Sequence, residues 1–325
     1  MQMDDSRIAM KEKLEFVGII KEALKIPIKN PKFIFTILLT SFPLFCSLCL
    51  HETIFQRALI ESLRSQADDP PPHEGVVIIY RSSWPYRSSG PSLYAFRDWI
   101  GNFISRKLLV QSFTLLAIIH LFDLLNTIIT VSTASAIYAE EKEMMTKPFI
   151  ENKVALFKGP LITSIYALLL NSLALVGLFT LSINIYVMWS AFTFFTLTYM
   201  LLFVALFTKY IEWSAVWNTG IVISILEQNK HGDVALGVSA YISRGSRKRG
   251  FLIMLVFFAW SFGLRLSSLC VGWQKGNVVI EVILAQACLD CLGRVMKWVA
   301  FMIYFYDCKK RFIEKKFDGS AEGKA

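Results

Sequence analysis

Apolar runs long enough to cross a bilayer constrain this chain more than any other feature. The clearest run, residues 33–50, contains no Asp, Glu, Lys or Arg over 18 residues, and a span needs about 20 predominantly apolar residues. Since the chain is 54% hydrophobic and only 18% charged, these runs are too abundant for one or two water-soluble domains. The sequence therefore predicts an all-α integral membrane bundle of about six transmembrane helices.

The predicted spans are separated by polar segments of very different length. The longest of these is a polar loop at 55–107, and the short run 76–80 within it can form a strand. The six spans are predicted at 33–54, 108–138, 161–188, 191–226 (the last including an extension), 251–273 and 278–306.

An amphipathic segment precedes the first span. Residues 7–29 alternate Lys and Glu with apolar residues at helical spacing, within a cytosolic segment at 1–32. This pattern predicts a helix that lies along the membrane surface. The alternative is an ordinary amphipathic helix that packs on protein.

The distribution of basic residues predicts the orientation. With both termini inside, 23 of the 34 Lys and Arg residues fall in the inside segments and 8 in the outside loops. Basic residues favour the cytosolic side, so we expect both termini, the connector 227–250 and the tail 307–325 to be cytosolic. The expected location is the endomembrane system or the plasma membrane. The net charge of +9 then faces anionic lipid headgroups, and we expect no nucleic-acid partner.

The connector 227–250 ends in a cluster of positive charge directly before the fifth predicted span. We predict that it binds anionic membrane lipids or unknown protein partners. The alternative is that the charges only orient the span. Phosphorylation of Ser243 or Ser246 would offset the charge and make the cluster an electrostatic switch. The four basic residues of the cluster are Arg244, Arg247, Lys248 and Arg249.

Ionisable residues inside the spans are the second group of candidates, because charges are costly in hydrocarbon unless they pair or reach water. They form either a proton or ion pathway or static pairs between helices. We predict that Asp123 or Asp290 neutralises Arg265 or Arg294. The group comprises His120, Asp123, Arg265, Glu281, Asp290, Arg294 and Lys297, and Thr127 shares a helical face with the first two.

The six cysteines lie in or beside apolar runs, so we expect no disulfide framework. Two Cys-x-x-Cys pairs, Cys46/Cys49 and Cys288/Cys291, lack the turn residues of a zinc site, and we expect no metal and no cofactor. Cys308 follows the last span and precedes two lysines, which makes it a candidate for reversible palmitoylation.

Several stretches of the chain carry a resemblance to a known family. They are FVGIIKEALKI (16–26), the Pro43-Leu44 pair, SAIYAEE (135–141), IVISILEQNKHGDVALGVSAYISRGSRKRG (221–250) and YFYDCKK (304–310). Through nearly its whole length the chain resembles a family of uncharacterised plant multi-span transmembrane proteins, some of which are labelled as binders of a polyadenylate-binding protein. The resemblance implies a multi-pass membrane protein and brings no established activity.

No Ser/His/Asp set, HExxH motif or paired-carboxylate signature occurs in the chain, so we do not expect an enzyme. We predict a non-enzymatic scaffold or adaptor that binds lipids or protein partners through cytosolic basic surfaces. The alternative is a carrier or channel for a small solute or ion. The two classes differ in whether the polar face of His120, Asp123 and Thr127 meets another helix or water.

Overall fold

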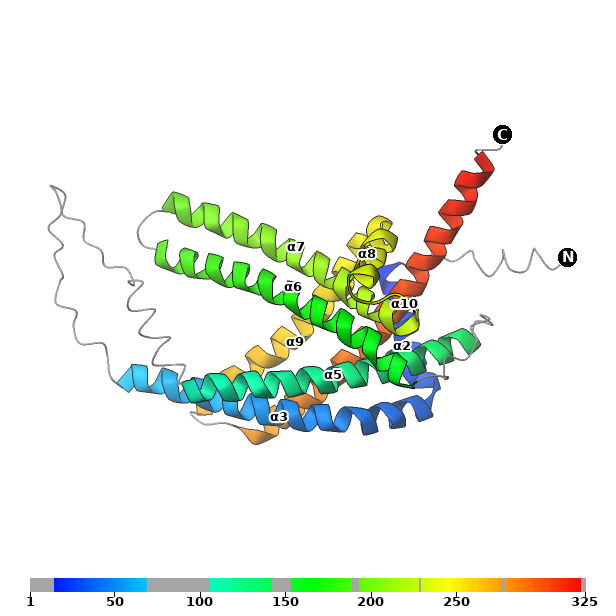
Figure 1. Cartoon of the computed structure of the whole chain (residues 1–325). Helices are drawn as coiled ribbons and strands as arrows, with labels where there is room; N and C mark the ends of the chain where they lie inside the picture. The colour runs from blue at the N-terminus through cyan, green and yellow to red at the C-terminus, as the bar shows by residue number, and fades with distance from the viewer. Residues whose placement is uncertain are drawn as a thin grey trace.

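The structure is a computed structural model that describes residues 15–68, 106–141, 153–188, 193–227, 229–275 and 279–322. All regular elements in these ranges are helices, which confirms the all-α prediction. The helices, labelled as in Figure 1, are α2 (Phe16–Lys29), α3 (Pro31–Asp68), α5 (Arg106–Glu141), α6 (Lys153–Met188), α7 (Thr193–Leu226), α8 (Gly232–Ile242), the short 3-10 helix η1 (Ser243–Gly245), α9 (Arg247–Lys275) and α10 (Ile280–Glu322).

Five of these helices contain a segment long and apolar enough to cross a membrane, so the chain is a multi-pass helical membrane protein. The described part of the predicted sixth span 278–306 lies almost entirely in α10, and it is not among these five segments. It differs because ionisable side chains interrupt its apolar sequence. The five segments are Pro31–Glu61, Val110–Ala139, Phe157–Tyr186, Phe194–Leu226 and Arg247–Lys275.

Two predicted polar segments are more helical than their composition indicated. Helix α3 runs on to Asp68, well past the predicted end of the first span at 54. The extension contains neither Gly nor Pro, and Arg57 and Glu61 form an ion pair of 3.1 Å one helical turn apart. The rest of the predicted loop, residues 69–105, lies outside the described residues, as does the run 76–80. The tail after 306 is likewise helical, because α10 continues to Glu322.

Helix α2 has a buried face and an exposed apolar face. Ile19, Ala23 and Ile26 are buried in the main core of the bundle, as their spacing of four and three residues predicts. Val17 and Ile28 remain exposed, which suits a helix at the bilayer surface. The helix therefore packs on protein with one side and presents apolar side chains with the other.

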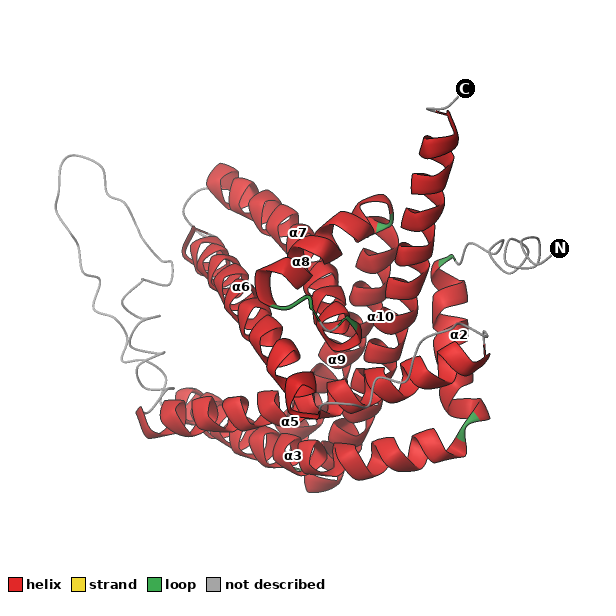
Figure 2. Ribbon diagram, turned by 45° about the vertical axis from the view of Figure 1, so that its right-hand side comes forward, coloured by secondary structure: helices red, strands yellow, loops and turns green. Residues whose placement is uncertain are grey.

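The main core is concentrated at one end of the bundle, which we call the terminal end because α2 and the end of α10 lie there (Figure 1). Helices α3 and α5 lie side by side, and the paired helices α6 and α7 diverge from them toward the opposite end (Figures 1 and 2). Many apolar side chains of the α6–α7 pair are exposed, as expected for surfaces that face lipid. In contrast, residues 298–305 of α10 form a continuous buried stretch in the core.

Candidate functional site

The connector is a folded element that packs against α7 and α6. Helix α8 runs back along the end of α7, where the Ser239 hydroxyl donates to the carbonyl oxygen of Val216 at 2.7 Å. At its start, the Gly232 amide donates to Thr163 Oγ1 of α6 at 2.8 Å. Gly232 has φ of +59°, a left-handed conformation that glycine adopts without steric penalty. The chain turn between α7 and α8 is thus fixed by its own sequence and by a contact with α6.

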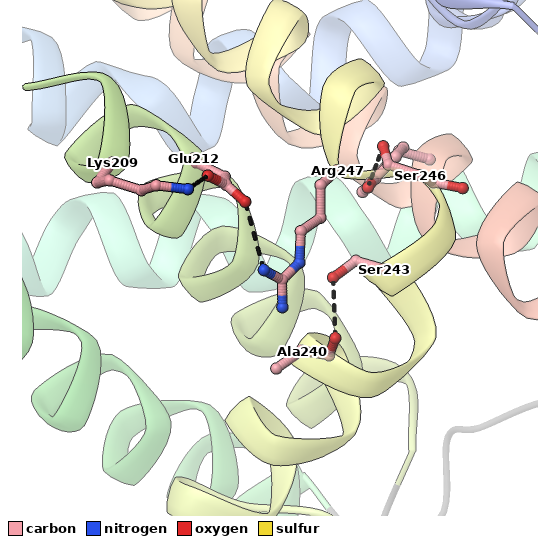
Figure 3. Close-up of polar contacts among 7 residues, drawn as sticks. Lys209, Glu212, Ala240, Ser243, Ser246 and Arg247 are labelled. Atoms are coloured by element: carbon pink, nitrogen blue, oxygen red, sulfur yellow. Dashed lines mark hydrogen bonds and ion pairs between the residues drawn. The ribbon is translucent and has the colours of Figure 1, made fainter. Parts of the chain in front are cut away.

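Arg247 of the basic cluster binds α7. Its Nη1 lies 3.4 Å from Glu212 Oε1 (Figure 3). Its guanidinium carbon lies 5.6 Å from the centre of the Trp213 ring. Lys209 also contacts Glu212, with 2.7 Å between Nζ and Oε2. The first residue of α9 is therefore fastened to α7 by an ion pair and a cation–π contact.

Arg249 binds α10. Its Nη1 donates to Asp307 Oδ2 at 2.5 Å, and its Nη2 donates to the hydroxyl of Ser246. Arg311 Nε donates to the same Asp307 oxygen at 2.9 Å. Nearby, the Tyr304 hydroxyl donates to the carbonyl oxygen of Ser246 at 3.1 Å. A buried carboxylate thus joins the start of α9 to the end of α10 through two guanidinium groups.

A third contact joins the end of α7 to α10. Glu227 accepts ion pairs from Lys309 and from Lys230, each at 2.7 Å. Burial by itself raises the pKa of Glu227, but the hydrogen bonds and charges of Lys230 and Lys309 outweigh it and lower the pKa. The glutamate is therefore held in its ionised form.

Arg244 and Lys248 differ from the other two basic residues of the cluster. Both are exposed, and neither forms an ion pair with any described residue. The sequence predicted four equivalent charges, whereas the folded connector turns Arg247 and Arg249 toward the bundle. Only Arg244 and Lys248 are left to face a ligand at the start of α9.

The structure argues against both modification hypotheses. Ser243 and Ser246 are only 2% and 6% exposed, and the Ser243 hydroxyl points to the carbonyl oxygen of Ala240 at 3.5 Å (Figure 3). A kinase could not reach either hydroxyl in this fold. Cys308 is 1% exposed, and burial raises the pKa of its thiol, so palmitoylation at this position is disfavoured as well.

The predicted charge pairing is confirmed between α5 and α10. Arg294 of α10 forms ion pairs with Asp123 of α5 at 3.2 Å and with Asp290, one turn earlier on α10, at 3.0 Å. The Ser261 hydroxyl of α9 donates to Asp290 Oδ1 at 2.9 Å. This group joins three helices. Arg265, the other cation considered, is exposed on α9 and forms no ion pair in the described part of the chain.

The remaining predicted polar residues of α5 also meet protein. His120 Nε2 lies 2.7 Å from the Ser164 hydroxyl of α6. Thr127 Oγ1 donates to the backbone oxygen of Asp123 at 2.6 Å. Because the charges bind one another and His120 binds a neighbouring helix, these contacts favour static pairing over an open pathway.

A further buried polar cluster was missed by the sequence analysis. Gln56 Nε2 of α3 donates to Ser268 Oγ of α9 at 2.8 Å and lies 3.2 Å from Glu52 Oε1. It also lies 3.5 Å from Gln286 Oε1 of α10. The four-residue spacing of Glu52 and Gln56 was the available signal, but residues from 55 onward were assigned to a polar loop.

The cysteines are all free thiols. Among the described residues, no grouping of His, Cys, Asp and Glu has the arrangement needed to hold a metal ion.

No family model, no curated protein and no solved structure matches the chain. The class of the protein comes from its fold: the chain is a multi-pass α-helical membrane protein whose main core lies at one end of the bundle.

Proposed function

We propose that the protein is a non-enzymatic membrane scaffold or adaptor that binds anionic lipid headgroups through Arg244 and Lys248. The observation that supports this is the division of the cluster: Arg247 and Arg249 hold the connector against α7 and α10, while Arg244 and Lys248 are exposed. Two exposed charges on a rigid element lose less conformational entropy on binding than charges on a flexible loop. Their position beside the start of an apolar helix supports a location at headgroup depth.

The proposed orientation puts the terminal end in the cytosol, in an endomembrane or the plasma membrane. Membership of the uncharacterised plant family is also part of the proposal and is supported by the stretch 221–250.

A carrier or channel for a small solute or ion is the second candidate function. It is supported by the charged residues of α5 and α10, but their mutual pairing favours the scaffold.

The orientation predicts the outcome of a protease-protection experiment. Tags at the two ends of the chain should both be digested in sealed, right-side-out endomembrane vesicles, because the cytosolic face is outside. A tag inserted between residues 275 and 279, beyond the end of α9, should be protected until detergent is added. Protection of either terminal tag before detergent would contradict the orientation.

The lipid site predicts a selective loss of affinity. In purified protein titrated with a short-chain phosphoinositide, Arg244→Gln with Lys248→Gln should weaken binding about 30-fold, since each charge near an anionic headgroup contributes about 1 kcal/mol. The loss should shrink at high salt because the charges are exposed.

The matched control is Lys275→Gln, which removes an exposed charge at the opposite end of the same helix. It should leave the affinity unchanged, and short-chain phosphatidylcholine should not distinguish any of the variants. Equal phosphoinositide affinity in the double variant and the wild type would leave Arg244 and Lys248 with an orienting role only.

A further inference from the structure

Helix α9 carries an exposed arginine, Arg265, within a segment that is long and apolar enough to cross a membrane. Asp290 of α10 interacts with its charge through space, but the oxygens of Asp290 already accept from Arg294 Nε and from the Ser261 hydroxyl. Arg265 itself forms no ion pair with any described residue. Because a charge that faces hydrocarbon is costly unless it pairs or reaches a polar layer, Arg265 needs a polar partner beyond the described residues.

The length of the apolar segment of α9 indicates where Arg265 lies. Helix α9 begins beside α8 and runs away from the terminal end of the bundle (Figure 1). Residues 250–264 contain no Asp, Glu, Lys or Arg, and Lys248 and Arg265, on either side of them, are about 26 Å apart along the helix axis. The hydrocarbon layer is about 30 Å thick. A long basic side chain at each end of this segment can therefore extend to a headgroup layer.

Helix α3 gives the same thickness without reference to the connector. Its run without Asp, Glu, Lys or Arg, residues 33–50, is about 27 Å long. Just beyond the end of this run, α3 meets α9, where Gln56 Nε2 donates to Ser268 Oγ at 2.8 Å. Ser268 lies three residues after Arg265. Two helices thus change from apolar to polar at the same level of the bundle, and Arg265 lies at that level.

The surface around Arg265 is apolar. Phe262, one turn earlier on α9, is 58% exposed, and Leu266, the next residue, is 50% exposed. These side chains suit acyl chains, while the planar guanidinium donates two parallel hydrogen bonds to a phosphate group. A phospholipid supplies both kinds of contact within one molecule.

We propose that Arg265 binds the phosphate group of a phospholipid in the leaflet opposite to the connector. The site is separate from Arg244 and Lys248, since it lies at the other end of the apolar segment of α9 and uses a different leaflet. The apolar side chains of Phe262 and Leu266 then contact the acyl chains of the same lipid. Helix α9 is thereby held to lipid at both ends of its apolar segment.

The test uses purified full-length protein in detergent, titrated with short-chain phosphatidylglycerol and followed by native mass spectrometry. All variants carry Arg244→Gln and Lys248→Gln, so the outcome does not depend on the connector site. Adding Arg265→Gln should weaken the affinity about fivefold, the contribution of one charge at an anionic headgroup. Arg265→Lys keeps the charge but loses the two parallel hydrogen bonds, so its affinity should lie between the two. Short-chain diacylglycerol, which lacks the phosphate, should not distinguish the variants.

Arg57→Gln in the same background is the matched control, because Arg57 is exposed on α3 and already paired with Glu61. It should leave the phosphatidylglycerol affinity unchanged. Arg265→Gln should also leave the Tm without lipid unchanged, since Arg265 has no ion pair within the described protein to lose. Equal phosphatidylglycerol affinity with and without Arg265→Gln overturns the proposal. So does a dimer that becomes monomeric on this substitution, because Arg265 then pairs with a second copy of the chain.

Discussion

Replacing Arg294 by methionine should lower the free energy of unfolding by roughly 3–5 kcal/mol, because it leaves the carboxylates of Asp123 and Asp290 buried without their cation. Both ion pairs of this residue lie inside the bundle, at 3.2 and 3.0 Å. The measurement is thermal unfolding of the purified protein in detergent. The same substitution at Arg57, whose pair with Glu61 is exposed, is the matched control and should change the stability by at most about 1 kcal/mol.

A multiple-mutant cycle then separates pairing from mere burial. Replacing Asp123 and Asp290 by leucine in the Arg294→Met background should restore much of the lost stability, since apolar residues of similar volume are often tolerated in place of a buried ion pair. A combined loss equal to the sum of the separate losses would show that these groups do not interact.

Gly250→Ala should destabilise the protein by about 1–3 kcal/mol, although alanine is the better helix former. A Cβ at this position would lie 2.9 Å from the Tyr304 hydroxyl and 3.3 Å from Ala215 Cβ. Tyr304 is 1% exposed and donates to the carbonyl oxygen of Ser246, so it cannot move without giving up that bond. The close approach of α9 and α10 at the connector therefore requires glycine.

Gly263→Ala on the same helix is the control. A Cβ there meets nothing within 4 Å, so alanine should leave the stability unchanged or raise it by up to about 1 kcal/mol. Tyr304→Phe removes the atom nearest to the new methyl group and should partly rescue Gly250→Ala. Equal melting temperatures for the two alanine variants would contradict the assigned packing.

The membrane class of the fold was predictable because it depends on local sequence. A long apolar run without charges must form a helix in a bilayer, since its backbone groups have no other hydrogen-bond partners there. The same local reasoning predicted the contact of Asp290 with Arg294, which are four residues apart. It failed at the end of α3, because residues 55–68 were classified as a loop by their polarity, whereas they extend the helix to Asp68.

The roles of individual side chains depended on the tertiary structure. Arg247 and Arg249 are adjacent in sequence to Lys248, but their carboxylate partners, Glu212 and Asp307, lie 35 and 58 residues away along the chain. Asp123 meets Arg294 only because α5 packs against α10.

The sequence by itself determined that the chain forms apolar helices in a membrane, because apolar length and helical spacing are properties of neighbouring residues. The tertiary structure decided which charges are satisfied internally and which two remain exposed on the connector. These depend on distances between side chains of different helices, and such distances are set by how the whole bundle packs.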